Sequence, residues 1–450
     1  MQENVVVVGG GLVGAMMAAL LTEKNKVSVY ESRPDLRKQV VDGGRSINLI
    51  MTSRGLKALR AIGLQEKAKE IGVPVHGRTM HSIKGELTYQ PYGIDDSEFN
   101  YSISRKELNK VLMTRAEELG AQFYFRHRLL AVDEKQRSIA FEKADGAKVS
   151  KSVGRLIGAD GGGSQVRAWM TQEPGYDYRY EPFTHAYKEL KIPAEKSLEF
   201  NLDPTSLHIW PRGGIMLMAL PNRDGSFTVT LYLPIEGVDS FATLQTDENV
   251  SELFTRLFPD SVPLIPDLHK DFAENPVSSL GTVRCNPWHV GGFSTLIGDA
   301  AHAIVPFFGQ GMNCGLEDCT TLVECIEDCD DWQQSFELFS KRRKPNADAI
   351  ADLSLDNFVE MAERVGDPRF LLKKKVEQLL ENKWPTQYRS RYALVVYTLV
   401  PYYKALAAGH IQNEILDDLC KDIDSPEDVD LDKAKTLIDA RLTPYLGMID

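Results

Sequence analysis

A glycine-rich segment close to the N-terminus has the spacing of a nucleotide-binding turn. Gly9, Gly11 and Gly14 fit the pattern G-x-G-x-x-G, between a run of valines and a stretch rich in Ala, Leu and Met. Glycines at this spacing allow a tight turn and let backbone amides approach a pyrophosphate at the N-terminus of the following helix. Glu31 ends the next expected strand, where a carboxylate accepts a hydrogen bond from an adenosine ribose 2′-hydroxyl and repels a 2′-phosphate. The segment favours FAD or NAD over NADP at this site, although a single motif of this kind is also compatible with an ordinary glycine turn.

Two later segments each place an aspartate directly after an expected strand. Asp160 follows the strand 155–158, and Asp299 follows the strand 294–297. Both aspartates therefore lie at strand ends, where α/β sheets bind ligands. In this order the three segments resemble the fingerprints of FAD-dependent aromatic-ring hydroxylases, the p-hydroxybenzoate hydroxylase-like family. The resemblance implies that the Asp160 segment serves FAD and the pyridine nucleotide, and that Asp299 serves the FAD ribose.

Beyond Asp299, a second glycine-rich turn leads into an expected helix. Its N-terminal amides can face the pyrimidine edge of a flavin, which carries negative charge when the flavin is reduced. Arg105 begins another expected helix, 105–119, and is either a solvated charge or, as the resemblance implies, an FAD contact. The expected FAD contacts are Gly9, Gly11, Val13, Gly14, Glu31, Arg33, Arg105, Leu129, Asp160, Asp299, Met312 and Asn313.

Four segments resemble kynurenine 3-monooxygenases more specifically than the shared FAD fingerprints do. They are 44–49, 207–212, 219–222 and 299–308, and the similarity runs from Val5 to about Tyr392 before it weakens. The resemblance implies an NADPH- and O2-dependent monooxygenase of tryptophan degradation and NAD biosynthesis. It would hydroxylate L-kynurenine to 3-hydroxykynurenine through a flavin C4a-hydroperoxide, with FAD bound and NADPH as co-substrate. The alternatives are a related FAD hydroxylase of another aromatic acid, a halogenase of the same fold, and a non-catalytic flavin-binding protein.

The same resemblance implies substrate contacts from Arg78, Tyr92, Asn357 and Tyr392. A guanidinium can hold an α-carboxylate through two hydrogen bonds, while two phenols and an amide supply the remaining polar contacts of an amino-acid ligand. Taken singly, Arg78 is more simply a surface charge and Tyr92 a packing residue. Only the joint match favours a substrate site.

Two aromatic residues and one histidine near the second glycine-rich turn have more than one interpretation. Phe307 and Phe308 form either a pocket wall that faces the substrate ring or core packing beneath the flavin. His302 lies inside the FAD fingerprint, so we do not assign it as an acid or base. No catalytic side chain is assigned, because the flavin itself performs the redox chemistry.

Composition excludes several other classes of protein. The chain has 52 basic and 64 acidic residues, and this net charge of −12 disfavours nucleic-acid binding. The six cysteines lack paired C-x-x-C spacing, so we expect reduced core residues and no metal site.

Pro401 and Lys404 interrupt the apolar stretch 392–409, which favours a buried helix pair over a membrane span. We expect a cytoplasmic protein without a membrane anchor, either a monomer or a homodimer.

The order of expected elements predicts an α/β protein with a Rossmann-like FAD-binding domain, an inserted antiparallel β-sheet substrate domain and a C-terminal helical region. The expected FAD-binding domain is discontinuous and comprises 1–75, 98–175 and 278–334. The segments 76–97 and 176–277, mostly strands, are expected to form the substrate domain, and 335–450 the helical region. Breaks between helices are expected at Pro345, Pro368, Pro385 and Pro401.

Overall fold

The structure, a computed structural model, describes residues 3–38, 48–194, 202–361, 367–447 and 449 of the chain. The chain forms two compact units. The first comprises Met1–Gly72, Ile103–Phe183 and Ser279–Ala351, and the second comprises Val73–Ser102, Thr184–Ser278 and Asp352–Asp450. Residues 44–47, part of one segment that resembles kynurenine 3-monooxygenases, lie outside the described residues.

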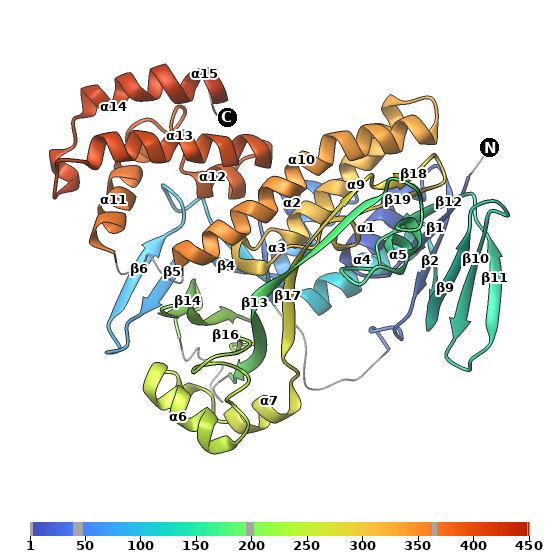
Figure 1. Ribbon diagram of the computed structural model, residues 1–450, viewed down its shortest axis with the longest axis horizontal. Coiled ribbons are helices and arrows are strands. Elements are labelled where there is room, and N and C mark those ends of the chain that lie inside the picture. Colours follow the sequence, from blue (N-terminus) through green and yellow to red (C-terminus); the bar gives the residue numbers. More distant parts are fainter. Residues whose placement is uncertain (1–2, 39–47, 195–201, 362–366, 448, 450) are drawn as a thin grey trace. The chain divides into compact units, whose positions relative to one another are not determined.

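A six-stranded sheet with the order β18-β19-β12-β1-β2-β8 organises the first unit (Figure 1). Strands β19, β12, β1, β2 and β8 pair in parallel, and β18 pairs antiparallel to β19. The valines of β1 are at most 5% exposed, as expected for a central strand of a parallel sheet. This sheet confirms the Rossmann-like fold predicted from the sequence. Its strands are β1 (Asn4–Val8), β2 (Lys26–Glu31), β8 (Gln122–Phe125), β12 (Arg155–Gly158), β18 (His289–Val290) and β19 (Ser294–Leu296).

Helices and a small second sheet complete the first unit. Helix α1 packs against α4 and α9, and because Ala, Met and Leu occupy all its sides, nearly the whole helix is buried. The antiparallel strands β9 (His127–Asp133), β10 (Ser138–Lys143) and β11 (Lys148–Ser152) form a separate sheet. The other elements are α1 (Leu12–Leu21), β3 (Asn48–Met51), α2 (Ser53–Arg60), α3 (Gln65–Ile71), α4 (Arg105–Glu118), α5 (Gln165–Met170), α8 (Asp299–His302) and α9 (Gly311–Asp328).

The expected helix break at Pro345 is wrong. Helix α10 runs from Trp332 to Val359 without interruption, with Pro345 in its interior. A proline there removes one backbone hydrogen bond and costs about 3 kcal/mol. Phe336, Phe339 and Ile350 on the same helix are fully buried, and this burial offsets the cost.

An antiparallel sheet dominates the second unit, with β13, β16, β15, β14, β5 and β6 as consecutive neighbours. Only β14 and β5 pair in parallel. As expected, most of the regular structure between 176 and 277 is strand, and the two helices α6 and α7, which the sequence did not suggest, follow the strands. The elements are β4 (Val73–Val75), β5 (Gly77–His81), β6 (Leu87–Pro91), β7 (Asn100–Ser104), β13 (Asp177–Ile192), β14 (Ser206–Arg212), β15 (Ile215–Pro221), β16 (Phe227–Pro234), α6 (Asp247–Leu257) and α7 (Leu268–Glu274). The next strand, β17 (Ser278–Asn286), belongs to the first unit apart from Ser278.

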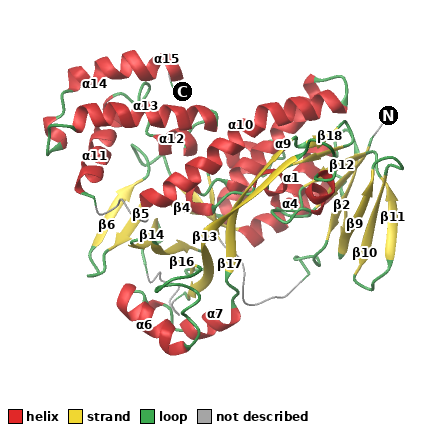
Figure 2. Cartoon of the chain, viewed as in Figure 1, coloured by secondary structure: helices red, strands yellow, loops and turns green. Residues whose placement is uncertain are grey.

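The C-terminal part of the second unit is helical (Figure 2). Pro368 begins α11, Pro385 lies between α11 and α12, and Pro401 caps α13, so these three prolines do mark helix boundaries. The expected buried helix pair corresponds to α12 and α13. Among the helices of the described residues, none has the length and apolar character needed to cross a bilayer. The helices are α11 (Pro368–Lys383), α12 (Arg391–Val396), α13 (Tyr402–Cys420), α14 (Leu431–Leu437) and α15 (Thr443–Leu446).

Candidate functional site

The first glycine-rich turn joins β1 to α1 and contains two positions that admit no side chain. A Cβ atom on Gly14 would lie 2.0 Å from the carbonyl oxygen of Gly9, and one on Gly9, whose φ is +101°, would lie 2.4 Å from the carbonyl oxygen of Ala159. At Gly11, by contrast, a Cβ atom would meet nothing within 4 Å. Gly11 also caps α1 without a side-chain hydrogen bond. The helix N-terminus therefore faces open space, which fits a pyrophosphate bound by backbone amides.

Glu31, at the end of β2, is a buried carboxylate held by its own neighbours. It accepts hydrogen bonds from the amide of Gly10 at 2.8 Å and from the amide and Nε of Arg33 at 2.8 and 2.9 Å. Burial raises the pKa of Glu31, but Arg33 and the two amides together outweigh it, so the pKa lies below its ordinary value. The side chain is therefore charged at neutral pH and lies next to the glycine-rich turn, where a ribose hydroxyl donor is expected.

Asp160 follows β12, and its carboxylate organises the loop that leads into α5. It accepts hydrogen bonds from Ser164 Oγ at 2.5 Å and from the amide of Gln165 at 2.7 Å. Arg167, on α5, donates to the carbonyl oxygens of Gly162 and Ala300, the latter at 2.6 Å. The loop of the second fingerprint is thus tied directly to the helix that begins at Asp299.

The N-terminal turn of α9 contains the predicted contacts Met312 and Asn313. The Asn313 side chain is fully buried and accepts a hydrogen bond from the amide of Thr52 at 3.0 Å. Its amide group donates to the carbonyl oxygens of Ile50 at 2.8 Å and Gly309 at 3.0 Å. The side chain therefore fixes β3 and the start of α2 against α9. What this turn can offer a flavin is its backbone, since α9 begins without a side-chain cap.

The other predicted contacts of the first unit differ in exposure. Arg105 is exposed at the start of α4 and Asp299 at the start of α8, whereas Leu129 on β9 is 6% exposed. Phe307 and Phe308 are each 6% exposed, and the Phe307 ring lies 5.5 Å from that of Phe183. The aromatic pair is therefore packed, whichever of its two expected roles applies. Val13 contacts both Gly298 and Gly315 closely enough that a Cβ atom on either would clash or crowd it.

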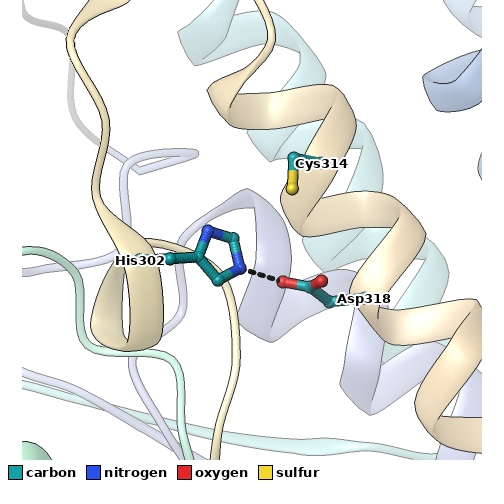
Figure 3. Close-up of side chains that lie close together, drawn as sticks. All are labelled: His302, Cys314 and Asp318. Carbon is teal, nitrogen blue, oxygen red and sulfur yellow. Dashed lines mark hydrogen bonds and ion pairs between the residues drawn. The ribbon is translucent and has the colours of Figure 1, made fainter. Parts of the chain in front are cut away.

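His302, Cys314 and Asp318 form a buried cluster whose composition would suit a metal ion. One potential ligand atom from each lies within 4.8 Å of the others (Figure 3). However, His302 Nε2 lies 2.6 Å from Asp318 Oδ2, and the Arg343 guanidinium lies 2.7 Å from Asp318 Oδ1 and 3.2 Å from Cys314 Sγ. Burial raises the pKa of Cys314, so its thiol keeps its proton. A guanidinium at this position repels a metal ion, and the cluster is best described as a hydrogen-bonded network of ion pairs.

In the second unit, three of the four predicted substrate contacts come together in the fold. The Arg78 guanidinium lies 5.9 Å from the centre of the Tyr92 ring, and the Tyr92 and Tyr392 rings stack at 5.2 Å. Asn100, which the sequence did not suggest, donates to the Tyr392 hydroxyl at 3.0 Å. Burial raises the pKa of Tyr92 to about 12 although Arg78 opposes it, so this phenol is protonated at neutral pH.

The backbone positions of Arg78 and Tyr92 are set by the sheet. Arg78 pairs with Leu207 of β14 on one side and with Gln90 of β6 on the other. The amide of Tyr92 donates to the carbonyl oxygen of His76 at 2.9 Å. The guanidinium and the phenol are therefore presented side by side at the open end of the β5–β6 hairpin.

An acidic residue absent from our predictions also lies near Arg78. Glu360, at the end of α10, lies 3.2 Å from Lys374 Nζ and 3.6 Å from Arg391. Burial raises the pKa of Glu360, but Lys374, Arg78 and Arg391 outweigh it and hold the pKa below its ordinary value. Asn357 is 8% exposed and lies one helical turn earlier, where its amide donates to Met361 Sδ at 3.2 Å. The spacing of three residues between Asn357 and Glu360 is the signal that could have revealed Glu360.

Comparison with known proteins agrees with this arrangement. Residues 2–352 match the family described as FAD binding domain. The chain is 45% identical over 448 residues to a kynurenine 3-monooxygenase of Myxococcus xanthus (strain DK1622), covering 99% of this chain and 97% of that protein. It is 41% identical to a kynurenine 3-monooxygenase of Stenotrophomonas maltophilia (strain K279a), covering 98% and 97%.

Solved structures resemble the fold at lower sequence identity. A tetrameric form of 2-methyl-3-hydroxypyridine-5-carboxylic acid oxygenase superposes with a TM-score of 0.66 at 19% identity, covering 84% of this chain and 97% of that one. A tetracycline destructase superposes with a TM-score of 0.63 at 13% identity, covering 85% and 97%. These two show the fold alone. The family match over most of the chain and the high identity to the bacterial relatives show that the chain belongs to the FAD-binding-domain family and, within it, to the kynurenine 3-monooxygenases.

Proposed function

We propose that the chain is an NADPH- and O2-dependent FAD monooxygenase that hydroxylates L-kynurenine to 3-hydroxykynurenine. The observation that carries this proposal is the grouping of Arg78, Tyr92 and Tyr392 in the second unit, with the rings stacked and the guanidinium over one of them. Relatives that share more than two fifths of the sequence are named for this reaction.

The residues around the glycine-rich turn fit FAD as the bound cofactor. The open N-terminus of α1 would hold the pyrophosphate, Glu31 the adenosine ribose, Asp299 the ribityl chain on the flavin side, and the backbone at Met312 the flavin. When bound, FAD supplies the redox chemistry that links NADPH and dioxygen to hydroxylation. We further propose that the segments 1–75, 98–175 and 278–334 carry this cofactor, that 76–97 and 176–277 carry the substrate contacts of the sheet, and that 335–450 supplies those of the helices.

Arg78 is suited to hold the α-carboxylate of an amino acid. Its fork of N–H groups can donate two parallel hydrogen bonds to a carboxylate, and the Tyr92 ring beneath it limits its rotation. The charge of Glu360 lowers the cost of keeping Arg78 in a partly buried position before the substrate binds. Tyr92 and Tyr392 keep their protons at neutral pH, so both can donate hydrogen bonds.

The proposed reaction needs no catalytic acid or base to activate the substrate. The aromatic amine of kynurenine already donates electrons into the ring, so the position beside it is reactive towards an electrophilic oxygen. The protein's part is to hold this ring in one orientation and to exclude water, which would divert the reaction to hydrogen peroxide.

The proposal is tested by following NADPH oxidation with L-kynurenine while the product is analysed by mass spectrometry. We expect purified protein to carry FAD, to consume NADPH faster when kynurenine is added, and to yield kynurenine with one added oxygen. Consumption of NADPH with only hydrogen peroxide as product would contradict the proposal and favour the alternative, a related hydroxylase of another aromatic acid.

The substrate contacts are tested separately by Arg78→Ala and Tyr392→Phe. Loss of a charge-assisted pair should raise the KM for kynurenine by about tenfold to a hundredfold in Arg78→Ala, and loss of one hydroxyl should have a smaller effect in Tyr392→Phe. Arg179→Ala and Tyr403→Phe are matched controls, because Arg179 is 68% exposed and Tyr403 is 43% exposed. Unchanged KM values in both test variants would refute the assigned substrate site.

A further inference from the structure

Asp318, on α9, is a fully buried carboxylate that contacts three different elements of the first unit. Its Oδ2 accepts a hydrogen bond from the amide of Gly298 at 3.0 Å. The same oxygen accepts from His302 Nε2 at 2.6 Å (Figure 3). Its Oδ1 accepts from Arg343 Nε, on α10, at 2.7 Å. Both oxygens of this carboxylate therefore accept hydrogen bonds from groups within the protein.

The charge of Asp318 is stabilised where it lies. Burial raises its pKa, but His302 and Arg343 together outweigh burial and hold the pKa below its ordinary value. Arg343 is in turn paired with Glu317 at 2.6 Å, and Glu317 with Arg54 of α2 at 2.8 Å. A buried charge persists in a protein only when it is paired and hydrogen-bonded in this way.

The turn that Asp318 holds has a conformation that needs support. Gly298 adopts φ +58° and ψ −144°, a backbone region that side-chain-bearing residues avoid. Its carbonyl oxygen accepts hydrogen bonds from the amides of Ala301 at 2.8 Å and His302 at 2.9 Å, and so begins α8. Asp299 is the first residue of that helix. Asp318 therefore holds both the residue before Asp299 and the residue that ends its helix.

We propose that Asp318 is a positioning residue for FAD, which acts by fixing the Gly298–Asp299 turn so that Asp299 is in place before the cofactor arrives. Helix α9 would thus perform two tasks. Its N-terminal residues would face the flavin, and the carboxylate of Asp318, less than two helical turns further on, would fix the Gly298–Asp299 segment that serves the ribityl chain. The inference rests on FAD binding, as proposed above, and is independent of which aromatic substrate is hydroxylated.

The test is a double-mutant cycle read as FAD affinity rather than as activity. The dissociation constant of FAD is measured by flavin fluorescence on apoprotein of the wild type, Asp318→Asn, Asp299→Asn and the double variant. We expect Asp318→Asn to weaken FAD by about tenfold or more, because a buried amide and an imidazole lose their charged acceptor. If Asp318 acts through Asp299, the double variant should be no weaker than the weaker single variant. Losses that multiply, or an unchanged affinity in Asp318→Asn, would overturn the proposal.

Glu317→Gln is the matched control, because Glu317 belongs to the same ion-pair network but pairs with Arg54 and Arg343 and not with the turn at Gly298. It should lower the thermal midpoint of the apoprotein while leaving the FAD dissociation constant within about twofold. An equal loss of FAD affinity in both variants would show that Asp318 acts only through general stability.

A second measurement covers the case in which Asp318→Asn does not fold. The Gly298 amide of the wild-type apoprotein should be protected from hydrogen exchange, since the proposal requires the turn to be fixed before FAD binds. Fast exchange at Gly298 in folded apoprotein would overturn it. Wild-type protein that binds no FAD would overturn both this inference and the proposed function, whereas normal wild-type binding with an unaffected Asp318→Asn variant would overturn this inference alone.

Discussion

Glu381, on α11, should make the stability of the protein depend on pH in a direction opposite to that of most carboxylates. Its side chain is 10% exposed, lies 3.2 Å from Arg389 Nε and accepts a hydrogen bond from the amide of Ser390 at 3.2 Å. Burial raises the pKa of Glu381 to about 7, and the like charge of Glu377 adds to this rise. Arg389 opposes the rise but is shared with Glu98.

The magnitude follows from the difference between the folded and ordinary pKa values. With a folded pKa of about 7 against an ordinary 4.5, Glu381 binds its proton more tightly in the folded chain than in the unfolded one. This contribution to stability is therefore fully present below pH 4.5 and is lost as the pH rises to about 7. The total loss is roughly 3 kcal/mol at about 1.4 kcal/mol per pH unit.

The test is Glu381→Gln, a substitution that keeps the size of the side chain and cannot ionise. We expect Tm to be close to that of the wild type at pH 5 and higher by a few degrees at pH 8, where the wild type carries the unfavourable charge. Glu86→Gln, at an exposed position of the same unit, is the control and should shift Tm equally little at both pH values. A lower Tm for Glu381→Gln at pH 8 would refute the reasoning, because it would mean that Arg389 keeps Glu381 ionised and stabilising.

Three further changes have defined outcomes. Gly14→Ala should yield protein largely without flavin, measured as the ratio of flavin to protein absorbance, because the added methyl group would lie 2.0 Å from the carbonyl oxygen of Gly9 and displace the turn. Asn100→Ala should raise the KM for kynurenine by about threefold to tenfold with little change in kcat, since the Tyr392 hydroxyl loses its 3.0 Å donor. Lys188→Met should lower stability to urea by about 2–4 kcal/mol, because the buried ammonium donates to two carbonyl oxygens at the end of α7 that no methionine can satisfy.

The cofactor-binding turns could be predicted from the sequence because their determinants are local. The conformation at Gly9 and the close approach at Gly14 depend on residues within one strand–turn–helix unit, and the spacing to Glu31 is fixed by the length of one α-helix. In such a segment, sequence order and spatial order are nearly the same. The chemistry of the turn could therefore be inferred before the sheet was known.

The use of individual side chains could not be predicted in the same way. The place of Asn313 at the start of α9 predicts a contact with FAD, but it does not reveal that its side chain bonds to β3 and to Thr52, 261 residues earlier in the chain. Asn100 and Tyr392 are likewise 292 residues apart. Nothing in the local pattern of one sequence encodes such a partner.

Other differences arise where a local signal was overlooked or was outweighed by packing. Helix α6 carries Val250, Leu253 and Phe254 at the spacing of one buried helical face, so the pattern of a helix was there within a block rich in strand formers. At Pro345 the local rule of a helix break fails because burial of α10 on both sides of the proline outweighs one missing hydrogen bond. Local propensity predicts an element correctly only where tertiary packing does not favour a different conformation by a larger free energy.

The network around Asp318 shows why a buried charge is suited to the turn before Asp299. An apolar residue at position 318 would leave the Gly298 amide, His302 and the Arg343 guanidinium without an acceptor, and each buried unpaired donor costs about 1–3 kcal/mol. The amide oxygen of an asparagine could replace Oδ2 and accept from Gly298 and His302, but its N–H groups would then face the Arg343 guanidinium. Only a carboxylate accepts from all three at once. The requirement therefore comes from the turn itself: a backbone conformation restricted to glycine exposes an amide that helix α9 must satisfy. The opposite charge of Arg343 and the hydrogen bond with His302 make a carboxylate stable at that position.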